Sequence, residues 1–453
     1  MNRPDIDQGH FVAIFGSGIA GAEAAFQLSK RGIYSVLFEQ HALPYGKIEE
    51  GLPKWHVKLR NQEEQKIDQK LTMPGVFYVP KTKFGKDLTL ADVGKWGFSA
   101  VLLAVGAWND RPLPVPGIDD FIGRGFYYQN SFVSWFNHNH EKNYDGTSCE
   151  ISDNAIVIGG GLASIDVAKI LMLETTRMAL EKRGIPADLF SLERDGIPET
   201  LKQHKLNFRQ LGLKGCVLFY RRRLIDMPLT PIPDNADKNR LEKVFLLRKR
   251  ILDNFLNKYL FRVEECHNPV DKIVENGRLR GIVFQKSQIR DGKLYPAGDF
   301  VRVRSPLVIS SIGSIPERIH EIPVEGDMLS IEDPVSGRIE GYDNIFAVGN
   351  AVTGRGNIRE SLTHSRETTR QIVRNYLNRE DERFSEYVRR REQHTAGTVN
   401  RMADSLVMSP LLSRDKISHI LMKIQKRQEK VGYSGNYSQW IQEKRPIRLE
   451  ELD

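Results

Sequence analysis

The chain has 453 residues, of which 40% are hydrophobic and 27% charged, and its formal net charge is +8. This length predicts two or three domains, and the composition is that of an ordinary globular protein rather than a disordered one. No apolar run approaches the roughly 18 residues needed to span a bilayer, and the polar start MNRPDIDQGH does not have the pattern of a signal peptide. We therefore expect no transmembrane segment and, because the three scattered cysteines fit a reducing compartment, a cytoplasmic protein.

The cysteines and histidines do not form a metal-binding pattern. Cys149, Cys216 and Cys266 lie far apart and include no CxxC pair, and the pair His138 and His140 has no third ligand at a recognisable spacing. The sequence thus predicts no metal, no iron–sulfur cluster and no disulfide framework. The moderate positive charge fits an acidic protein partner, nucleic acid, a membrane surface or nothing specific; we expect no nucleic-acid partner.

A glycine-rich turn follows the first predicted strand. Residues 11–15 (FVAIF) read as a buried parallel strand, an alanine-rich helix follows the turn, and a second strand ends at Glu39. In such a β-turn-α-β unit the glycines allow a tight turn and close approach of a diphosphate to the helix N-terminus, and the acidic residue binds a ribose. The residues expected to hold this first dinucleotide are Gly16, Ser17, Gly18, Ile19, Ala20, Gly21, Glu39 and Gln40.

A second glycine turn begins about a third of the way along the chain. The strand AIVI (155–158) leads into this turn and then into the helix IDVAKILML (165–173), and the partner strand is expected at 216–220 after a long helical excursion. That partner strand ends in Arg221-Arg222-Arg223 instead of a carboxylate. Arginines at this position suit the 2′-phosphate of NADP, so we expect the second dinucleotide to be NADP(H), held by Gly159, Gly161, Leu162, Ala163, Ser164, Arg221 and Arg222.

With these motifs, the chain resembles the adrenodoxin reductase family of ferredoxin–NADP reductases and, more distantly, the small subunit of glutamate synthase. The resemblance covers about residues 9–375. Its further motifs are VLLAVGA (101–107), the interdomain stretch SFVSWFNH (131–138), ISSIGSIP (309–316) and NIFAVGNAVTGRGNI (344–358).

The resemblance implies an α/β fold with two Rossmann-like domains, the NADP domain inserted in the FAD domain, plus a helical C-terminal extension. The expected boundaries are 1–115 and 325–380 for the FAD domain, 116–324 for the NADP domain and 381–453 for the extension. Related flavoproteins place an aspartate where Asn350 stands, to hold the ribitol chain, and an amide can also donate or accept there. The further FAD-binding residues implied are Gly106, Gly349, Asn350, Gly356, Asn357 and Ile358.

The activity implied is an FAD-dependent NADPH oxidoreductase that exchanges electrons with a one-electron iron–sulfur carrier such as ferredoxin. Hydride would pass between nicotinamide C4 and flavin N5, and this needs no catalytic side chain. An acidic carrier could dock on basic residues, for which 248–250 and 389–391 are candidates. Alternatives are the flavoprotein subunit of a larger redox complex, a non-catalytic nucleotide-binding regulator and, less favoured, a flavin-dependent monooxygenase.

The C-terminal segment carries an amphipathic pattern of its own. Ile417, Ile420, Leu421 and Ile424 recur at helical spacing with lysines around them. Such a helix can lie on a membrane surface. We expect it instead to pack on its own domain or on a partner subunit.

Overall fold

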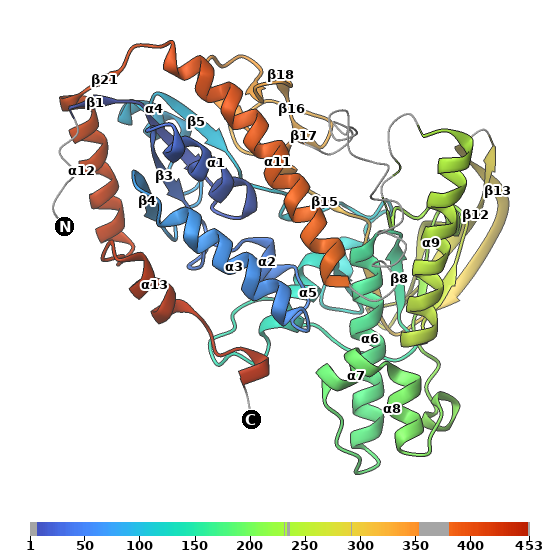
Figure 1. Ribbon diagram of the computed structural model, residues 1–453. Helices are drawn as coiled ribbons and strands as arrows, with labels where there is room; N and C mark the ends of the chain where they lie inside the picture. The colour runs from blue at the N-terminus through green and yellow to red at the C-terminus, as the bar shows by residue number, and fades with distance from the viewer. Residues whose placement is uncertain (1–6, 231, 233–235, 291, 353–379, 452–453) are drawn as a thin grey trace.

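The computed structural model describes residues 7–230, 232, 236–290, 292–352 and 380–451; the side chains of 380–384 are outside this description. Two α/β units lie side by side, each built on a mainly parallel sheet (Figure 1). The first sheet contains seven strands and the second contains five. The predicted fold class, with one α/β unit inserted in the other, is confirmed.

The first sheet has the strand order β18-β19-β20-β5-β2-β3-β4. Strands β20, β5, β2, β3 and β4 run parallel, whereas β18 and β19 are antiparallel additions at one edge. Because β2 is apolar throughout and buried on both faces, it forms the centre of the sheet. The strand bounds are β2 Phe11–Phe15, β3 Tyr34–Phe38, β4 Val76–Val79, β5 Ala100–Leu103, β18 Ile331–Asp333, β19 Arg338–Ile339 and β20 Ile345–Ala347.

Helices cover both faces of the first sheet. On one face lie α1 (Ile19–Lys30), α3 (Val57–Leu71) and α11 (Glu380–Val407), and their apolar residues form one core with the strands. On the other face lie α4 (Leu90–Trp96) and α12 (Arg414–Lys430). The short helix α2 (Lys47–Glu50) stands beside α3.

The C-terminal segment is part of the first unit in space. The apolar residues predicted on one face of 417–424 are buried in the core of the first sheet. The strand β21 (Leu412–Ser413) pairs with β1 (Gln8–Gly9), and α13 (Tyr437–Lys444) adds the buried side chain of Trp440. Packing on its own domain is therefore the correct alternative for this helix.

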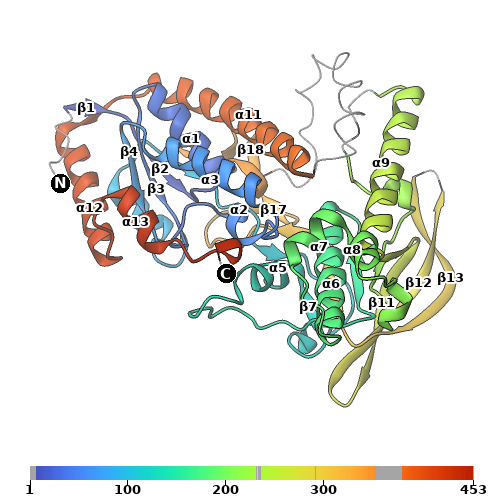
Figure 2. The same cartoon turned by 60° about the horizontal axis from the view of Figure 1, so that its bottom comes forward.

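The second sheet has the order β10-β9-β8-β14-β7 and is parallel throughout. Its strands are β7 Phe126–Tyr128, β8 Ile156–Gly159, β9 Val217–Phe219, β10 Arg262–Glu264 and β14 Val308–Ser311. One face is covered by α5 (Gln129–His138), α6 (Leu162–Glu181), α7 (Leu189–Asp195), α8 (Ile197–Gln203) and α9 (Lys238–Tyr259). The other face is covered by an antiparallel sheet of β11 (His267–Glu275), β12 (Arg278–Arg290) and β13 (Lys293–Arg304), which stands at the outer side of this unit (Figure 2).

Two connectors join the units. After β5 the chain leaves the first sheet through β6 (Asn109–Asp110), and after β14 it returns through β15 (Ser314–Ile315). These two short strands pair antiparallel with each other. The domain boundaries expected at 115/116 and 324/325 stay predictions. Among the described residues, no helix is both long enough and apolar enough to cross a bilayer.

Candidate functional site

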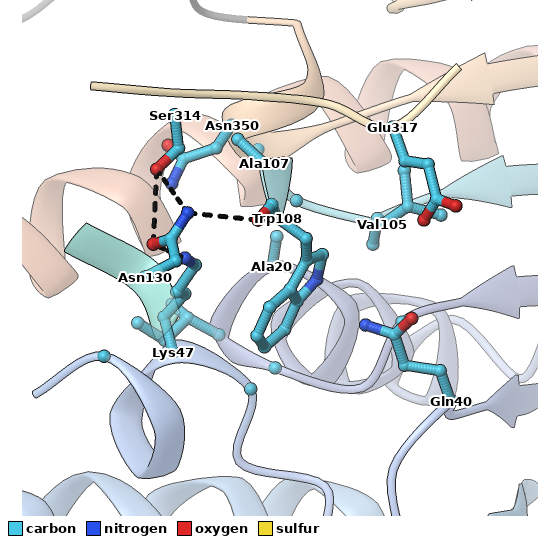
Figure 3. Close-up of a pocket in the computed structure, with 18 of the residues that line it drawn as sticks. Ala20, Gln40, Lys47, Val105, Ala107, Trp108, Asn130, Ser314, Glu317 and Asn350 are labelled. Carbon is cyan, nitrogen blue, oxygen red and sulfur yellow. Dashed lines mark hydrogen bonds between the residues drawn. The ribbon is translucent and has the colours of Figure 1, made fainter. Parts of the chain in front are cut away.

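A cavity of about 880 Å³ lies where the two units meet. Its lining includes the first glycine turn, the connector that follows β5, and the start of α6 in the second unit. Figure 3 shows Trp108 at its centre, with Gln40 and Glu317 at one end and Lys47, Asn130, Ser314 and Asn350 at the other. This volume falls in the range of cofactor sites. Of the predicted residues, the cavity is lined by Gly16, Gly18, Ile19, Ala20, Glu39, Gln40, Gly106, Leu162, Ala163, Gly349 and Asn350.

The first glycine turn is shaped by backbone that a side chain would displace. Gly16 has φ +96°, and a Cβ there would lie 2.4 Å from the carbonyl oxygen of Ala104. A Cβ on Gly21 would lie 1.8 Å from the carbonyl oxygen of Gly16. Helix α1 then begins at Ile19 without a side-chain cap and without an acidic residue in its first turn. Its first N–H groups thus remain available to an anion such as a diphosphate.

Glu39 lies at the carboxyl end of β3 and is only 3% exposed. Its Oε2 accepts hydrogen bonds from the backbone N–H (2.9 Å) and the hydroxyl (2.7 Å) of Ser17, and its Oε1 accepts one from the N–H of His41 (2.9 Å). A carboxylate has about four lone-pair sites, so about one remains for a ribose hydroxyl. Ser17 acts through this carboxylate rather than by lining the cavity itself.

The end of the cavity near the connectors holds a buried polar cluster. Lys47 Nζ donates to Asn130 Oδ1 (2.5 Å) and lies 4.9 Å from the centre of the Trp108 ring. Burial lowers the pKa of Lys47 to about 8, although Asp110 acts in the opposite direction. Burial raises the pKa of Asp110 to about 6. The cluster therefore brings a cation of modest proton affinity to the cavity wall.

Asn350 follows β20 and faces the same cavity. Its Oδ1 accepts a hydrogen bond from the hydroxyl of Tyr387 on α11 (3.3 Å). Gly349 has φ +76°, and a Cβ on it would lie 3.0 Å from that of Ala20 on α1. The segment after β20, predicted to bind FAD, and the first glycine turn thus meet in space. Gly356, Asn357 and Ile358, predicted to complete the site, lie outside the described residues.

The second glycine turn also needs its glycines. A Cβ on Gly159 would lie 2.4 Å from the carbonyl oxygen of Ser311 and 2.6 Å from the Cβ of Ser164. Ser164, at the third position of the motif, is fully buried and donates to the carbonyl oxygen of Gly161 (2.6 Å). A Cβ on Gly161 would meet nothing within 4 Å. Helix α6 starts at Leu162 without a side-chain cap, so its first N–H groups also remain available to an anion.

The arginines after β9 lie next to this second turn, since Phe219 is paired with Ile158 of β8. Arg221 is exposed, and Arg222 donates to the carbonyl oxygen of Gly292 (3.0 Å). Arg223 instead is bound by both carboxylate oxygens of Asp226. Neither Arg221 nor Arg222 lines the cavity described above, and the contact predicted between them and a ribose 2′-phosphate stays a prediction.

The basic candidate 248–250 is not a uniformly exposed patch. The guanidinium of Arg248 is buried and donates to the carbonyl oxygens of Thr230 (2.6 and 3.1 Å) and Ile225 (3.3 Å). It holds the 224–230 segment on α9. In the other candidate, Arg389 and Arg390 pair with Glu386.

Several cavity residues could not be identified from the sequence. They come from four segments that no motif connects, namely Tyr45 with Lys47, Trp108, Asn130 and Tyr387. Two motifs lay next to them: VLLAVGA (101–107) ends directly before Trp108, and the interdomain stretch 131–138 begins directly after Asn130. Tyr387 was missed because the segment after 380 was expected to be a separate extension.

The chain is similar in sequence to one family profile and to several known proteins. The pyridine nucleotide-disulphide oxidoreductase family profile matches residues 10–185. The mitochondrial NADPH:adrenodoxin oxidoreductase of Arabidopsis thaliana is 27% identical over 256 residues, which are 53% of this chain and 50% of that protein. The NADPH-ferredoxin reductase FprA of Mycobacterium leprae is 25% identical over 411 residues, 82% of this chain and 85% of that protein. The chain is a homologue of adrenodoxin reductase and FprA.

The solved structure of Mycobacterium tuberculosis FprA in complex with NADPH superposes with a TM-score of 0.67 at 19% identity, covering 93% of this chain and 91% of that one. The two proteins therefore share their fold over nearly the whole length of both chains. The match with the Arabidopsis protein, in contrast, spans only half of that relative's length.

Proposed function

We propose that this chain is an FAD-dependent NADPH oxidoreductase that passes electrons between NADP(H) and an acidic one-electron iron–sulfur carrier of the ferredoxin type. The observation that carries the proposal is that two uncapped helix N-termini open on one cavity. Gly18, Ile19 and Ala20 at the start of α1 line it, and so do Leu162 and Ala163 at the start of α6. Two dinucleotides held there would bring their reactive rings together.

We call the first glycine turn (16–21), the N-terminus of α1 and Glu39 the first cradle. The residues present there fit FAD. The turn at Gly16 and Gly21 leaves the α1 N-terminus open for a diphosphate, and Glu39 keeps acceptor capacity for a ribose. When bound, a flavin accepts hydride and releases electrons one at a time, so the cofactor supplies the redox chemistry. The chain's own residues bind and orient, and Lys47 holds a proton at Nζ beside the cavity.

The second glycine turn (159–164), the N-terminus of α6 and the arginines after β9 form the second cradle. Its residues support NADP(H) as the other nucleotide. Arg221 is exposed beside the open space at Gly161, where its charge can reach a 2′-phosphate. The partner would dock near the cavity. Arg391 lies on its rim with its guanidinium 5.2 Å from the centre of the Tyr387 ring, and it is a cationic contact for an acidic carrier. A cytoplasmic location is part of the same proposal.

Anaerobic titration of the flavin-loaded protein with NADPH tests the proposal. We expect the flavin absorbance bands to bleach, and added ferredoxin to be required for cytochrome c reduction. A protein that takes up no flavin would support the nucleotide-binding regulator instead. Co-purification with a larger partner, together with no response to added ferredoxin, would support a subunit of a redox complex.

A further inference from the structure

The two units are held together by little backbone structure. The ribbon of β6 and β15 pairs Ser314 with Asp110 and Ile315 with Asn109. A ribbon of two-residue strands is weak by itself. Interfaces between domains of one chain allow relative motion unless side-chain contacts oppose it. The orientation of the two units must therefore depend on side-chain contacts between them.

Helix α5 of the second unit presents a polar stripe to the first unit. Asn130, Ser134, Asn137 and His138 follow the spacing i, i+4, i+7 and i+8, which places them on one helix face. Ser134 Oγ donates to Glu50 Oε2 on α2 (2.9 Å). Asn137, buried, donates to the carbonyl oxygens of residues 49 and 52 and accepts from the N–H of residue 54. Together with the ring contact between buried Trp55 and Phe136 of α5, these polar contacts hold α5 against the first unit.

Asn130 lies at the point where this stripe meets both connectors. Its amide Nδ2 donates to the carbonyl oxygen of Trp108 (3.0 Å) on the outgoing connector and to Ser314 Oγ (3.1 Å) on the returning one. Its Oδ1 accepts from Lys47 Nζ on α2, and its backbone N–H donates to Asp110 Oδ1 (3.1 Å). One side chain therefore ties both connectors and α2 to the first turn of α5 (Figure 3).

We propose that Asn130 is a positioning residue that locks the two connectors and thereby sets the distance and angle between the two nucleotide cradles. The inference rests on the proposed function for its kinetic consequence, whereas its structural consequence stands by itself. A side chain without an amide could not make all of these contacts, because they use both amide hydrogens and the carbonyl oxygen of Asn130 at once. Loss of the side chain frees the ribbon to twist while it leaves the glycine turns of both cradles intact.

The kinetic consequence follows from geometry. Reaction between two bound groups depends steeply on their alignment, and a misplacement of about 1 Å can cost about 10²-fold in rate. The Asn130→Ala variant should accordingly slow flavin reduction by NADPH about 10- to 100-fold in single-turnover experiments. Asn130 lies on the cavity wall, but the glycine turns, Glu39 and Arg221, which are proposed to hold the two dinucleotides, are unchanged in this variant. The dissociation constants of FAD and NADPH should therefore change less than about threefold.

The structural readout is a distance between the two units, measured by pulsed EPR without any turnover. Spin labels would be attached at Lys95→Cys on α4 and Lys202→Cys on α8, both exposed, in a Cys266→Ser background; Cys149 and Cys216 are buried. We expect a single narrow distance distribution in the otherwise unaltered protein. In Asn130→Ala the distribution should broaden or shift.

Asn139→Ala is the matched control. Asn139 ends the same helix, is exposed, and donates to the carbonyl oxygens of Trp135 and Phe136 of its own helix. Its variant should show the parent distance distribution and the parent reduction rate. If Asn130→Ala does not fold, Ser314→Ala, which removes one of the connector contacts, should broaden the distribution more mildly.

An unchanged distance distribution in Asn130→Ala, or an equal broadening in Asn139→Ala, would overturn the inference. So would an unchanged reduction rate in Asn130→Ala when the parent protein is reduced by NADPH. Failure of the proposed function gives a different result. The parent protein would then not be reduced, while the distance measurement would still report whether Asn130 locks the units.

Discussion

The Gly161→Ala substitution separates folding from nucleotide binding at the second cradle. Gly161 is the N-cap of α6 with φ −92° and ψ 175°, a conformation open to any residue, and a Cβ there meets no protein atom within 4 Å. The protein should therefore tolerate the added methyl group. The reduced freedom of the unfolded chain should leave the free energy of unfolding unchanged or raised by up to about 1 kcal/mol.

The same open space is where the diphosphate of NADPH has to lie if the helix end binds it. A methyl group in the path of a closely fitting ligand costs on the order of 1–3 kcal/mol, which corresponds to a dissociation constant about 5- to 150-fold higher. The two effects of Gly161→Ala should thus have opposite signs. FAD affinity should not change, because Gly161 is not among the residues that line the cavity between the units.

Two measurements check this prediction. Urea unfolding without nucleotide gives the stability, and anaerobic titration gives the NADPH dissociation constant. Gly94→Ala in α4 is the control, since it also adds a Cβ that meets nothing within 4 Å but lies away from the cavity. If Gly161→Ala binds NADPH as tightly as the parent protein does, the diphosphate does not lie over this turn, and the assignment of the second cradle fails.

Other substitutions have separate expected outcomes. Replacing the exposed Arg221 by Ala should weaken NADPH about 10-fold or more and leave NADH nearly unaffected; equal losses for both nucleotides would contradict a 2′-phosphate contact. Glu39→Gln places an amide group against the N–H and O–H donors that now face the carboxylate, and it should cost about 1–3 kcal/mol of FAD affinity. The loss would be seen as release of flavin on dialysis. Full retention of flavin would argue against the ribose role of Glu39. Arg448→Ala should lower the free energy of unfolding by about 3–5 kcal/mol, because it leaves buried carboxylates without their cation, whereas Arg445→Ala at an exposed pair should cost under 1 kcal/mol. Burial raises the pKa of Glu64 from 4.5 to about 7, so the protonated side chain's contribution to stability is fully present below pH 4.5 and is lost as the pH rises through 7. Thermal unfolding of the parent protein from pH 5 to 8 measures this loss. A melting temperature that rises over that range would contradict it.

The sequence by itself determined the two glycine turns and the strands beside them. Each turn is encoded within about 30 residues, because a buried strand, a turn that excludes Cβ atoms and a helix start are local features. The acidic end of β3 and the basic end of β9 are also local, and the different nucleotides that they predict for the two cradles stay a prediction. The insertion of one unit in the other came from a family resemblance, and the order of strands in the first sheet agrees with it.

Only the tertiary structure decided how the cradles face each other. The cluster of Lys47, Asp110, Asn130 and Ser314 joins residues as many as 267 positions apart, and no local pattern links them. The same holds for the C-terminal segment, whose residues enter the first core and whose Arg448 binds Glu49. Burial and hydrogen bonding between distant segments are properties of the packed chain, so the geometry between the two sites had to come from the fold.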